Sequence, residues 1–156
     1  GLSTAIQISP YVGSAEIYGL RVTPFLNFGL APAVDLRIGA ALIAGYGDRK
    51  EAPGFSFGAG GSAEVRFNLG SVYTISLGLV GGVFLFPSCT VFDKTPCDQT
   101  GWSSFGWFAP ELSPATFRFG SEHQFEAGYV IGGGIVKDDP WLVNLLVFTW
   151  LGPKLF

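Results

Sequence analysis

The strongest constraint on the fold is a two-residue alternation of hydrophobicity through residues 17–46. Apolar residues take every second position, and the positions between them are mostly small, polar or charged. The apolar set is Tyr18, Leu20, Val22, Pro24, Leu26, Phe28 and Leu30 and then, after a turn at Ala31-Pro32, Val34, Leu36, Ile38, Ala40, Leu42, Ala44 and Tyr46. Successive side chains of a strand point to opposite faces, so this period predicts a β-hairpin. We expect lipid on its apolar face and a filled lumen on the other.

The same alternation recurs along the whole chain and predicts eight strands. They are expected at Leu2–Val12, Ile17–Leu30, Val34–Tyr46, Phe55–Leu69, Val72–Phe86, Phe105–Phe119, Gln124–Val136 and Leu142–Phe156. The sixth should be interrupted, because Pro110 and Pro114 each remove a ladder donor. We therefore predict an all-β fold, an eight-stranded antiparallel up-and-down transmembrane β-barrel, with residues 1–156 as one domain.

The connections between these segments alternate in length. Those after the second, fourth and sixth segments are tight, whereas those after the third and fifth are long and polar and the one after the seventh is charged. Only the short first connection breaks the pattern. Outer-membrane barrels have short periplasmic turns and longer external loops. The alternation therefore predicts that both termini are periplasmic.

Composition favours a membrane protein. Only 13% of the 156 residues are charged and 48% are hydrophobic, and the charged share is about half that of soluble domains. The net charge of −3 gives no sign of a nucleic-acid partner. A helical membrane protein is the main alternative, because residues 67–92 carry no charge and could span as a helix. The barrel is favoured because residues 67–92 contain four glycines. It is also favoured because charges such as Arg21 and Glu64 interrupt the other apolar stretches.

Charged residues within the predicted strands fall mostly on the inner face. An eight-stranded barrel is just wide enough inside for side chains, and buried charges there must be paired. We expect a lumen ion-pair network, with a narrow solute path as the alternative. Its predicted members are Arg21, Asp35, Arg37, Glu64, Arg66, Glu111 and Glu126; the strands also carry Arg118 and Lys154.

The two cysteines, Cys89 and Cys97, lie close together in the longest loop. An even number of cysteines in a loop of an exported protein predicts a disulfide, and two free thiols are the alternative. The chain begins at Gly1 without a positively charged segment. We expect a mature protein whose export signal has been removed or lies outside this chain.

Small residues form a predicted smooth patch on the outer face of the fourth and fifth segments. The members of this smooth patch are Ala59, Gly61, Ala63 and Gly81. A smooth wall lets another backbone approach closely, as small residues do between membrane helices, so the patch is a candidate partner-facing surface. The alternative is that these glycines only permit the curvature of a small barrel.

Sequence motifs give little support for catalysis. The single histidine, His123, lies in a turn, and no serine follows it closely as in barrel enzymes that modify lipids. The chain has no metal-ligand spacing, phosphate loop or nucleophile elbow, and Gly132-Gly133-Gly134 lacks the strand–loop–helix context of a nucleotide site. We expect no enzyme activity, no cofactor and no metal.

The C-terminal segment carries a family resemblance. Phe148, Trp150 and the terminal Phe156 resemble the final-strand signal of bacterial outer-membrane proteins, although Pro153 and Lys154 depart from its pattern. As a whole the chain resembles the small eight-stranded barrels of the OmpA/OmpX type. The resemblance implies residence in a Gram-negative outer membrane but no particular activity.

These observations lead to three functional hypotheses. The first is an outer-membrane barrel with a structural, anchoring or partner-binding role in a membrane-protein complex, embedded in the lipid bilayer. Its loop around Cys89 and Cys97, with Trp102 nearby, is the expected external contact site. The second is a channel or carrier for small hydrophobic solutes, and the third is a lipid-modifying enzyme.

Overall fold

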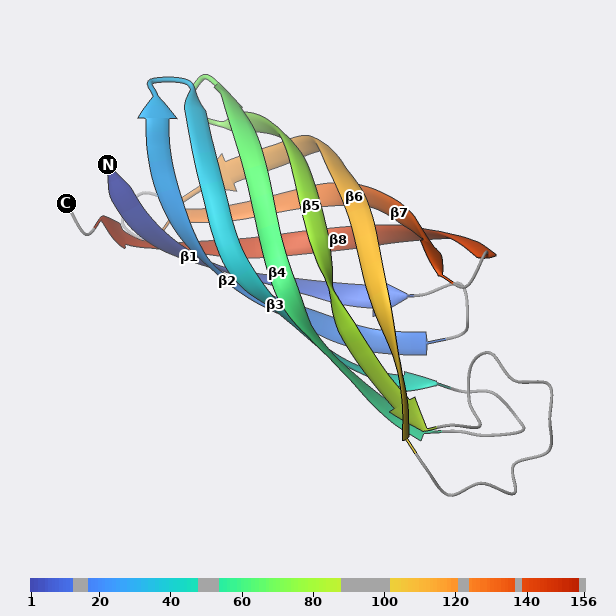
Figure 1. The fold of residues 1–156 in the computed structure, drawn as a ribbon. Coiled ribbons are helices and arrows are strands. Elements are labelled where there is room, and N and C mark those ends of the chain that lie inside the picture. The colour runs from blue at the N-terminus through green and yellow to red at the C-terminus, as the bar shows by residue number, and fades with distance from the viewer. Residues whose placement is uncertain (13–16, 48–53, 88–101, 121–123, 137–138, 155–156) are drawn as a thin grey trace.

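The chain forms a closed antiparallel β-barrel. The computed structural model describes residues 1–12, 17–47, 54–87, 102–120, 124–136 and 139–154. Each strand pairs with its neighbours in sequence, and β8 returns to β1 (Figure 1). The strands are β1 (Leu2–Val12), β2 (Ile17–Ala31), β3 (Val34–Gly47), β4 (Gly54–Leu69), β5 (Tyr73–Pro87), β6 (Trp102–Phe119), β7 (Gln124–Val136) and β8 (Asp139–Lys154). The predicted eight-stranded barrel is confirmed.

Most predicted boundaries agree with the structure to within a residue, but two strands begin earlier. β6 begins at Trp102, within the predicted loop, because Pro87 of β5 pairs with it. β8 begins at Asp139, because the β7–β8 ladder continues to the Val136–Asp139 pair and places Pro140 inside the strand. Proline is tolerated so near a strand's beginning. The sequence placed these residues in loops, and the ladder corrects that.

The helical alternative for residues 67–92 is wrong where the structure describes them. Residues 67–69 complete β4, and residues 73–87 form β5, which pairs with β4 from Leu69–Tyr73 to Phe57–Leu85. In the described part of the chain, no helix has the length and hydropathy to cross a membrane.

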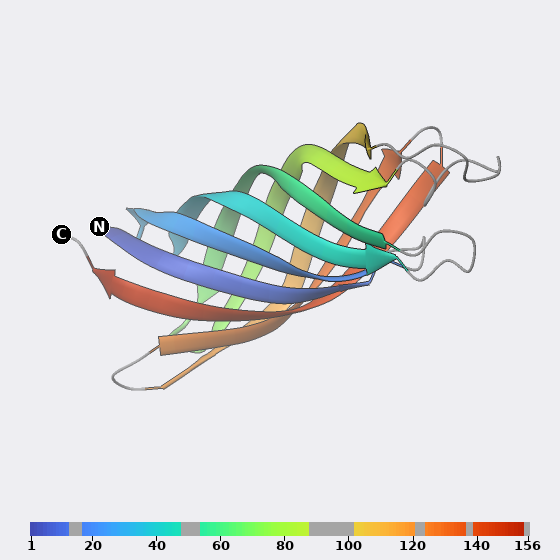
Figure 2. The ribbon, with the colours of Figure 1, turned by 90° about the horizontal axis from the view of Figure 1, so that it is seen from below.

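Short turns and both termini lie at one end of the barrel. Figures 1 and 2 show the β2–β3 and β4–β5 turns at the same end as the N- and C-termini. The turn glycines Gly70 and Gly120 have φ values of 82° and 94°, a left-handed conformation that glycine adopts without steric cost. We call this the turn end and the opposite end the loop end.

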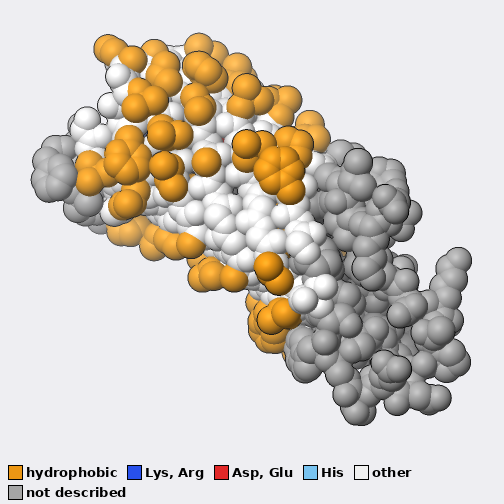
Figure 3. Space-filling model, viewed as in Figure 1, with side chains coloured by type: hydrophobic (Ala, Val, Ile, Leu, Met, Phe, Trp, Pro, Cys, Tyr) orange, Lys and Arg blue, Asp and Glu red, His pale blue; other side chains and the backbone are white. Residues whose placement is uncertain are grey.

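Burial alternates along the strands with the predicted period. In β1, Ala5, Gln7 and Ser9 are buried, whereas Ile6 and Ile8 are 40% and 44% exposed. The outer surface is accordingly apolar, and the face in Figure 3 shows hydrophobic side chains and no described charged ones. This distribution is the reverse of a soluble barrel, because polar residues such as Arg37, Thr23 and Glu126 fill the inside.

Glycines let two neighbouring strands approach closely on the inner face. Gly60 of β4 lies opposite Gly82 of β5. A Cβ at Gly60 would overlap the carbonyl oxygen of Gly81, and one at Gly82 would overlap that of Ala59. This wall could not take its observed shape with larger residues at these two inner positions.

Candidate functional site: the lumen ion-pair network

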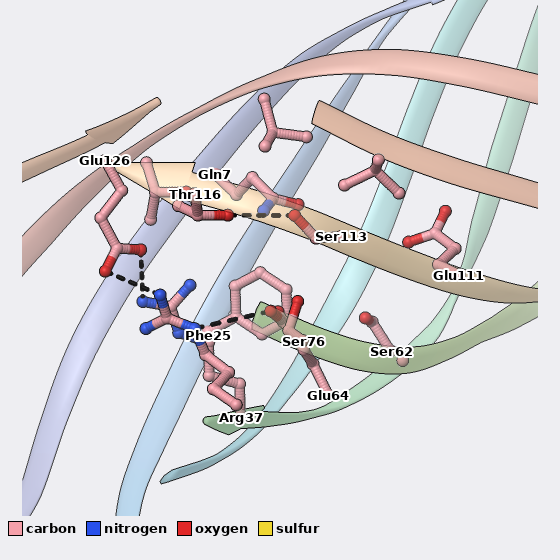
Figure 4. Close-up of a pocket in the computed structure, with 15 residues that line it drawn as sticks. Gln7, Phe25, Arg37, Ser62, Glu64, Ser76, Glu111, Ser113, Thr116 and Glu126 are labelled. Atoms are coloured by element: carbon pink, nitrogen blue, oxygen red, sulfur yellow. Dashed lines mark hydrogen bonds and ion pairs between the residues drawn. The ribbon is translucent and has the colours of Figure 1, made fainter. Parts of the chain in front are cut away.

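One buried carboxylate organises the lumen. Glu126 of β7 is 1% exposed and pairs with guanidinium nitrogens of three arginines. The N–O distances are 2.9 Å to Arg37 of β3, 2.7 Å to Arg66 of β4 and 3.0 Å to Arg118 of β6. Figure 4 shows the Glu126 carboxylate facing the Arg37 guanidinium. A single acid therefore links three strands to β7.

Two of the ion pairs connect opposite walls of the barrel. Glu126 and Arg37 lie on strands four positions apart in a ring of eight, and so do Arg21 of β2 and Glu111 of β6. The Arg21 guanidinium donates to both Glu111 carboxylate oxygens. Such bidentate pairs are strong and directional. These transverse bridges cross the space that a solute path would need.

Neighbouring strands supply the remaining contacts. The register places Arg37 opposite Glu64 and Asp35 opposite Arg66 across β3–β4. Glu64 lies 3.5 Å from the Arg66 guanidinium. Asp35 instead accepts a hydrogen bond from the Asn68 amide at 2.7 Å. Six of the seven predicted residues thus form ion pairs, and Asp35 uses a neutral partner.

Three network residues were absent from the predicted set. Arg118 completes the shell around Glu126, Asn27 accepts a hydrogen bond from Arg37 Nε at 2.6 Å, and Asn68 binds Asp35. Each occupies an inward position in its strand, which the alternation could have revealed. Arg118 was predicted as a strand charge outside the network, and the prediction from charged residues alone does not include neutral amides such as Asn27 and Asn68.

The network balances charge and leaves little free space. Among described side chains, four inward arginines (Arg21, Arg37, Arg66 and Arg118) face four inward acids (Asp35, Glu64, Glu111 and Glu126). The cavity between them measures about 20 Å³, which is room for about one water molecule. This cavity, which Arg37, Arg66 and Glu126 help to line, therefore offers space for water and not for a larger solute.

The predicted smooth patch lies on the outer wall. Ala59, Gly61 and Ala63 are exposed and Gly81 is partly exposed. A Cβ built on Gly61 would meet no atom within 4 Å. Gly61 lies opposite Ala40 of β3 and Gly81 of β5, so the row of small residues is three strands wide.

Other predicted features fall elsewhere. Cys89, Cys97 and His123 lie outside the described residues. Within the described ranges, no group of three or more histidine, cysteine or acidic residues could hold a metal ion.

A closed eight-stranded antiparallel barrel with an apolar exterior and a polar, ion-paired interior has the architecture of transmembrane barrels of the outer-membrane type. Solved structures with this fold are similar to the chain. Ail, the attachment invasion locus protein of Yersinia pestis, matches with a TM-score of 0.58 and 12% identity over 96% of each chain. The N-terminal β-barrel domain of Pseudomonas aeruginosa OprF matches with a TM-score of 0.52 and 14% identity, again over 96% of each chain.

A second structure of Ail, in complex with the heparin analogue sucrose octasulfate, matches with a TM-score of 0.58 and 14% identity over 96% of each chain. At these identities the likeness demonstrates a shared OmpA/OmpX-like barrel fold. No protein-family model matches the chain, and no curated protein sequence matches it significantly.

Proposed function

We propose that this protein resides in the outer membrane of a Gram-negative bacterium as a non-enzymatic barrel with a structural, anchoring or partner-binding role. The observation that carries the proposal is the lumen bridged from wall to wall by Arg37–Glu126 and Arg21–Glu111. Paired charges that bridge the interior around a water-sized cavity favour stability over transport. The fold shared with outer-membrane barrels supports the location.

The proposed partner-binding role uses two surfaces. Gly61 and its neighbours in the smooth patch offer a flat wall within the membrane, where close backbone approach favours association. The loop containing Cys89 and Cys97, closed by a disulfide, is proposed as the second contact site, outside the membrane. Both termini would then lie in the periplasm, at the turn end.

Electrical recording in planar bilayers tests whether the lumen is closed. We expect no conductance steps from the wild-type protein. The double variant Arg21→Ser/Glu111→Ser removes both members of one transverse bridge, leaves neither charge unpaired, and should produce small steps. Protection of the wild-type protein from added protease is the control for insertion. Steps from the wild-type protein would instead support the channel hypothesis.

Purification from native membranes in mild detergent tests the partner-binding role. We expect a specific membrane protein to accompany the wild-type chain in constant ratio. Replacing Gly61 with Leu should reduce that ratio, whereas Leu146→Phe on β8, exposed elsewhere on the outer wall, should leave it unchanged. An isolated monomer in every detergent would argue against a partner and favour a purely structural role.

A further inference from the structure

The ladder between β6 and β7 covers only the part of the two strands nearest the turn end. It stops at the pair Glu111–Gly132. β6 nevertheless continues to Trp102 and stays paired with β5 up to that residue. In Figure 1 the loop ends of β6 and β7 lie apart. One edge of β6 therefore has no described strand beside it from Pro110 to Trp102.

A proline explains where the pairing stops. In an antiparallel ladder, the backbone groups of successive residues point alternately to the two neighbouring strands. The Trp107 carbonyl oxygen lies 3.0 Å from the position of a Cβ on Gly81 of β5, so Trp107 points toward β5. Pro110 accordingly points the other way, and its carbonyl oxygen lies 3.4 Å from the position of a Cβ on Gly132 of β7. The next bond of the ladder would need an N–H, which proline lacks.

The same alternation identifies the backbone groups on the free side of β6. Ser104, Gly106 and Phe108 have the parity of Pro110, so each directs one N–H and one C=O away from β5. All three residues are exposed, and because Gly106 has no side chain, its exposed surface is backbone. Among the described residues, no backbone hydrogen bond outside the ladders reaches any of the three. We call Ser104, Gly106 and Phe108 the open edge.

The open edge lacks the features that usually protect a free strand. Natural proteins block such edges with charged side chains, prolines or bulges. Residues 102–109 contain no charge and no proline, and they pair with β5 without a register shift. A Cβ on Gly106 would meet only the Gly82 carbonyl oxygen, at 3.9 Å. A large side chain of an added strand therefore has room beside Gly106.

The length of β6 places the open edge at the surface of the bilayer. β6 has 18 residues, whereas a transmembrane strand needs about 9–11. Counted from Phe119 at the turn end, such a span ends between Glu111 and Ala109. In the proposed membrane location, Gly106 and Ser104 therefore lie beyond it, where their backbone groups can be reached from water.

An extended polypeptide is the ligand that this edge selects. Its donors and acceptors repeat at every second residue, about 7 Å apart, and another strand presents complementary groups at the same spacing. A lipid head group is too short to follow three such positions. A second copy of this chain, inserted the same way, would run its β6 in the same direction and could not pair antiparallel with this one.

We propose that the open edge binds an extended, uncharged segment of a partner polypeptide as an added antiparallel strand beside β6. Backbone hydrogen bonds to Ser104, Gly106 and Phe108 supply the affinity, and a large side chain opposite Gly106 supplies selectivity. This binding surface is separate from the smooth patch and does not depend on it.

Photocrosslinking with a synthetic peptide tests the site. The protein in phosphatidylcholine vesicles is mixed with a short peptide of alternating threonine and valine that has a benzophenone side chain at its centre. We expect adducts on residues 102–110, mapped by mass spectrometry. Methylating every second backbone nitrogen leaves one edge of the peptide free and should keep the adducts. Methylating every nitrogen should reduce them by about tenfold or more, because each lost hydrogen bond costs about twofold to tenfold in affinity.

A matched pair of variants changes one donor of the open edge. Gly106→Pro removes an N–H that points away from β5, so the β5–β6 ladder keeps its bonds. It should reduce the peptide adducts by about tenfold, whereas Gly106→Ala, which keeps the N–H, should leave them within about twofold. Heat-dependent mobility on gels verifies that each variant forms the barrel. Ser104→Pro with Ser104→Ala provides the same comparison should Gly106→Pro fail to fold.

The contrary outcomes are equally specific. Adducts spread evenly over the outer wall, adducts that full methylation of the peptide leaves unchanged, or adducts retained by the folded proline variant would overturn the proposal. Crosslinks between two barrels through the open edge would assign it to a second copy instead. Each of these results leaves the proposed membrane location standing, because protection of the barrel from added protease tests insertion separately.

Discussion

At the scale of single residues, stability depends on Glu126. Its side chain is 1% exposed and it faces Arg37, Arg66 and Arg118. Three arginines around one acid would repel each other strongly without it, and Arg66 gains only a longer 3.5 Å contact with Glu64. Because three arginines share this one carboxylate, loss of Glu126 would leave the most uncompensated charge in the lumen.

Glu126→Gln should therefore lower the free energy of unfolding by about 3–5 kcal/mol, the usual cost of breaking a buried ion pair from one side. Urea titration of the protein in vesicles, followed by tryptophan fluorescence, measures the change. Asp35→Asn is the matched control, because its partner is the neutral Asn68 amide. A Glu126→Gln variant as stable as the control would contradict the role assigned to this carboxylate.

Two consecutive glycines of β4 should respond differently to a methyl group. Gly60→Ala would drive its Cβ into the backbone of Gly81 and Gly82, whereas Gly61→Ala meets nothing within 4 Å. We expect the first to destabilise the barrel by about 1–3 kcal/mol, as overpacking does, and the second to have little effect. Paired urea titrations measure both, and similar values for the two variants would contradict the close approach of β4 and β5.

At the scale of the strand, one face of each strand meets lipid and the other face meets the polar lumen. Leu26 lies opposite Ile38 of β3 in a row of outward residues midway along β2, whereas Leu30 lies beside the turn. Asn27, one position further than Leu26, faces the lumen and contacts Arg37. One residue of register therefore decides whether a side chain meets lipid or the ion-pair network.

An arginine on the lipid face should cost more at mid-strand than near the turn. Leu26→Arg is expected to lower the free energy of unfolding by about 2–4 kcal/mol, because it places a charge near the bilayer midplane, and Leu30→Arg by about 0–1 kcal/mol. Unfolding from vesicles of fixed thickness provides the comparison. Equal costs at the two positions would show that the β2 midpoint is not at the membrane centre.

At the scale of the whole molecule, the barrel is apolar outside and charged inside. Its exterior carries large apolar side chains such as Phe55, Phe108 and Leu146, which are 65%, 58% and 57% exposed. Soluble proteins rarely expose a continuous apolar surface of this kind. The smooth patch interrupts this surface with small residues. Such a wall either meets lipid everywhere or meets a second protein at the patch.

A photocrosslinking amino acid at position 61 tests between these two possibilities in native membranes. We expect protein adducts from Gly61 and only lipid adducts from Leu146 on β8, which serves as the control. Mass spectrometry of the adducts identifies the partner. Lipid adducts alone at both positions would mean that the patch reflects barrel curvature.

The strands and their lipid-facing sides could be predicted from sequence because alternation is a local property. Each side chain's face follows from its parity within the strand, so β1 and β7 were predicted to the residue. The beginnings of β6 and β8 were not, because these residues carry turn signals and only their ladder partners, Pro87 for Trp102 and Val136 for Asp139, hold them in strands.

Parity alone determined that residues such as Arg37 and Glu126 would face inward, but not that they would meet. That pairing joins strands on opposite walls, 89 residues apart, and arises only when the sheet closes and sets the register of every ladder. The ladder between β6 and β7 likewise ends at Glu111–Gly132, at a point set by how the two strands meet in the closed barrel. Sequence determined which residues lie on each face of the barrel wall, and closure decided which groups face each other across the lumen.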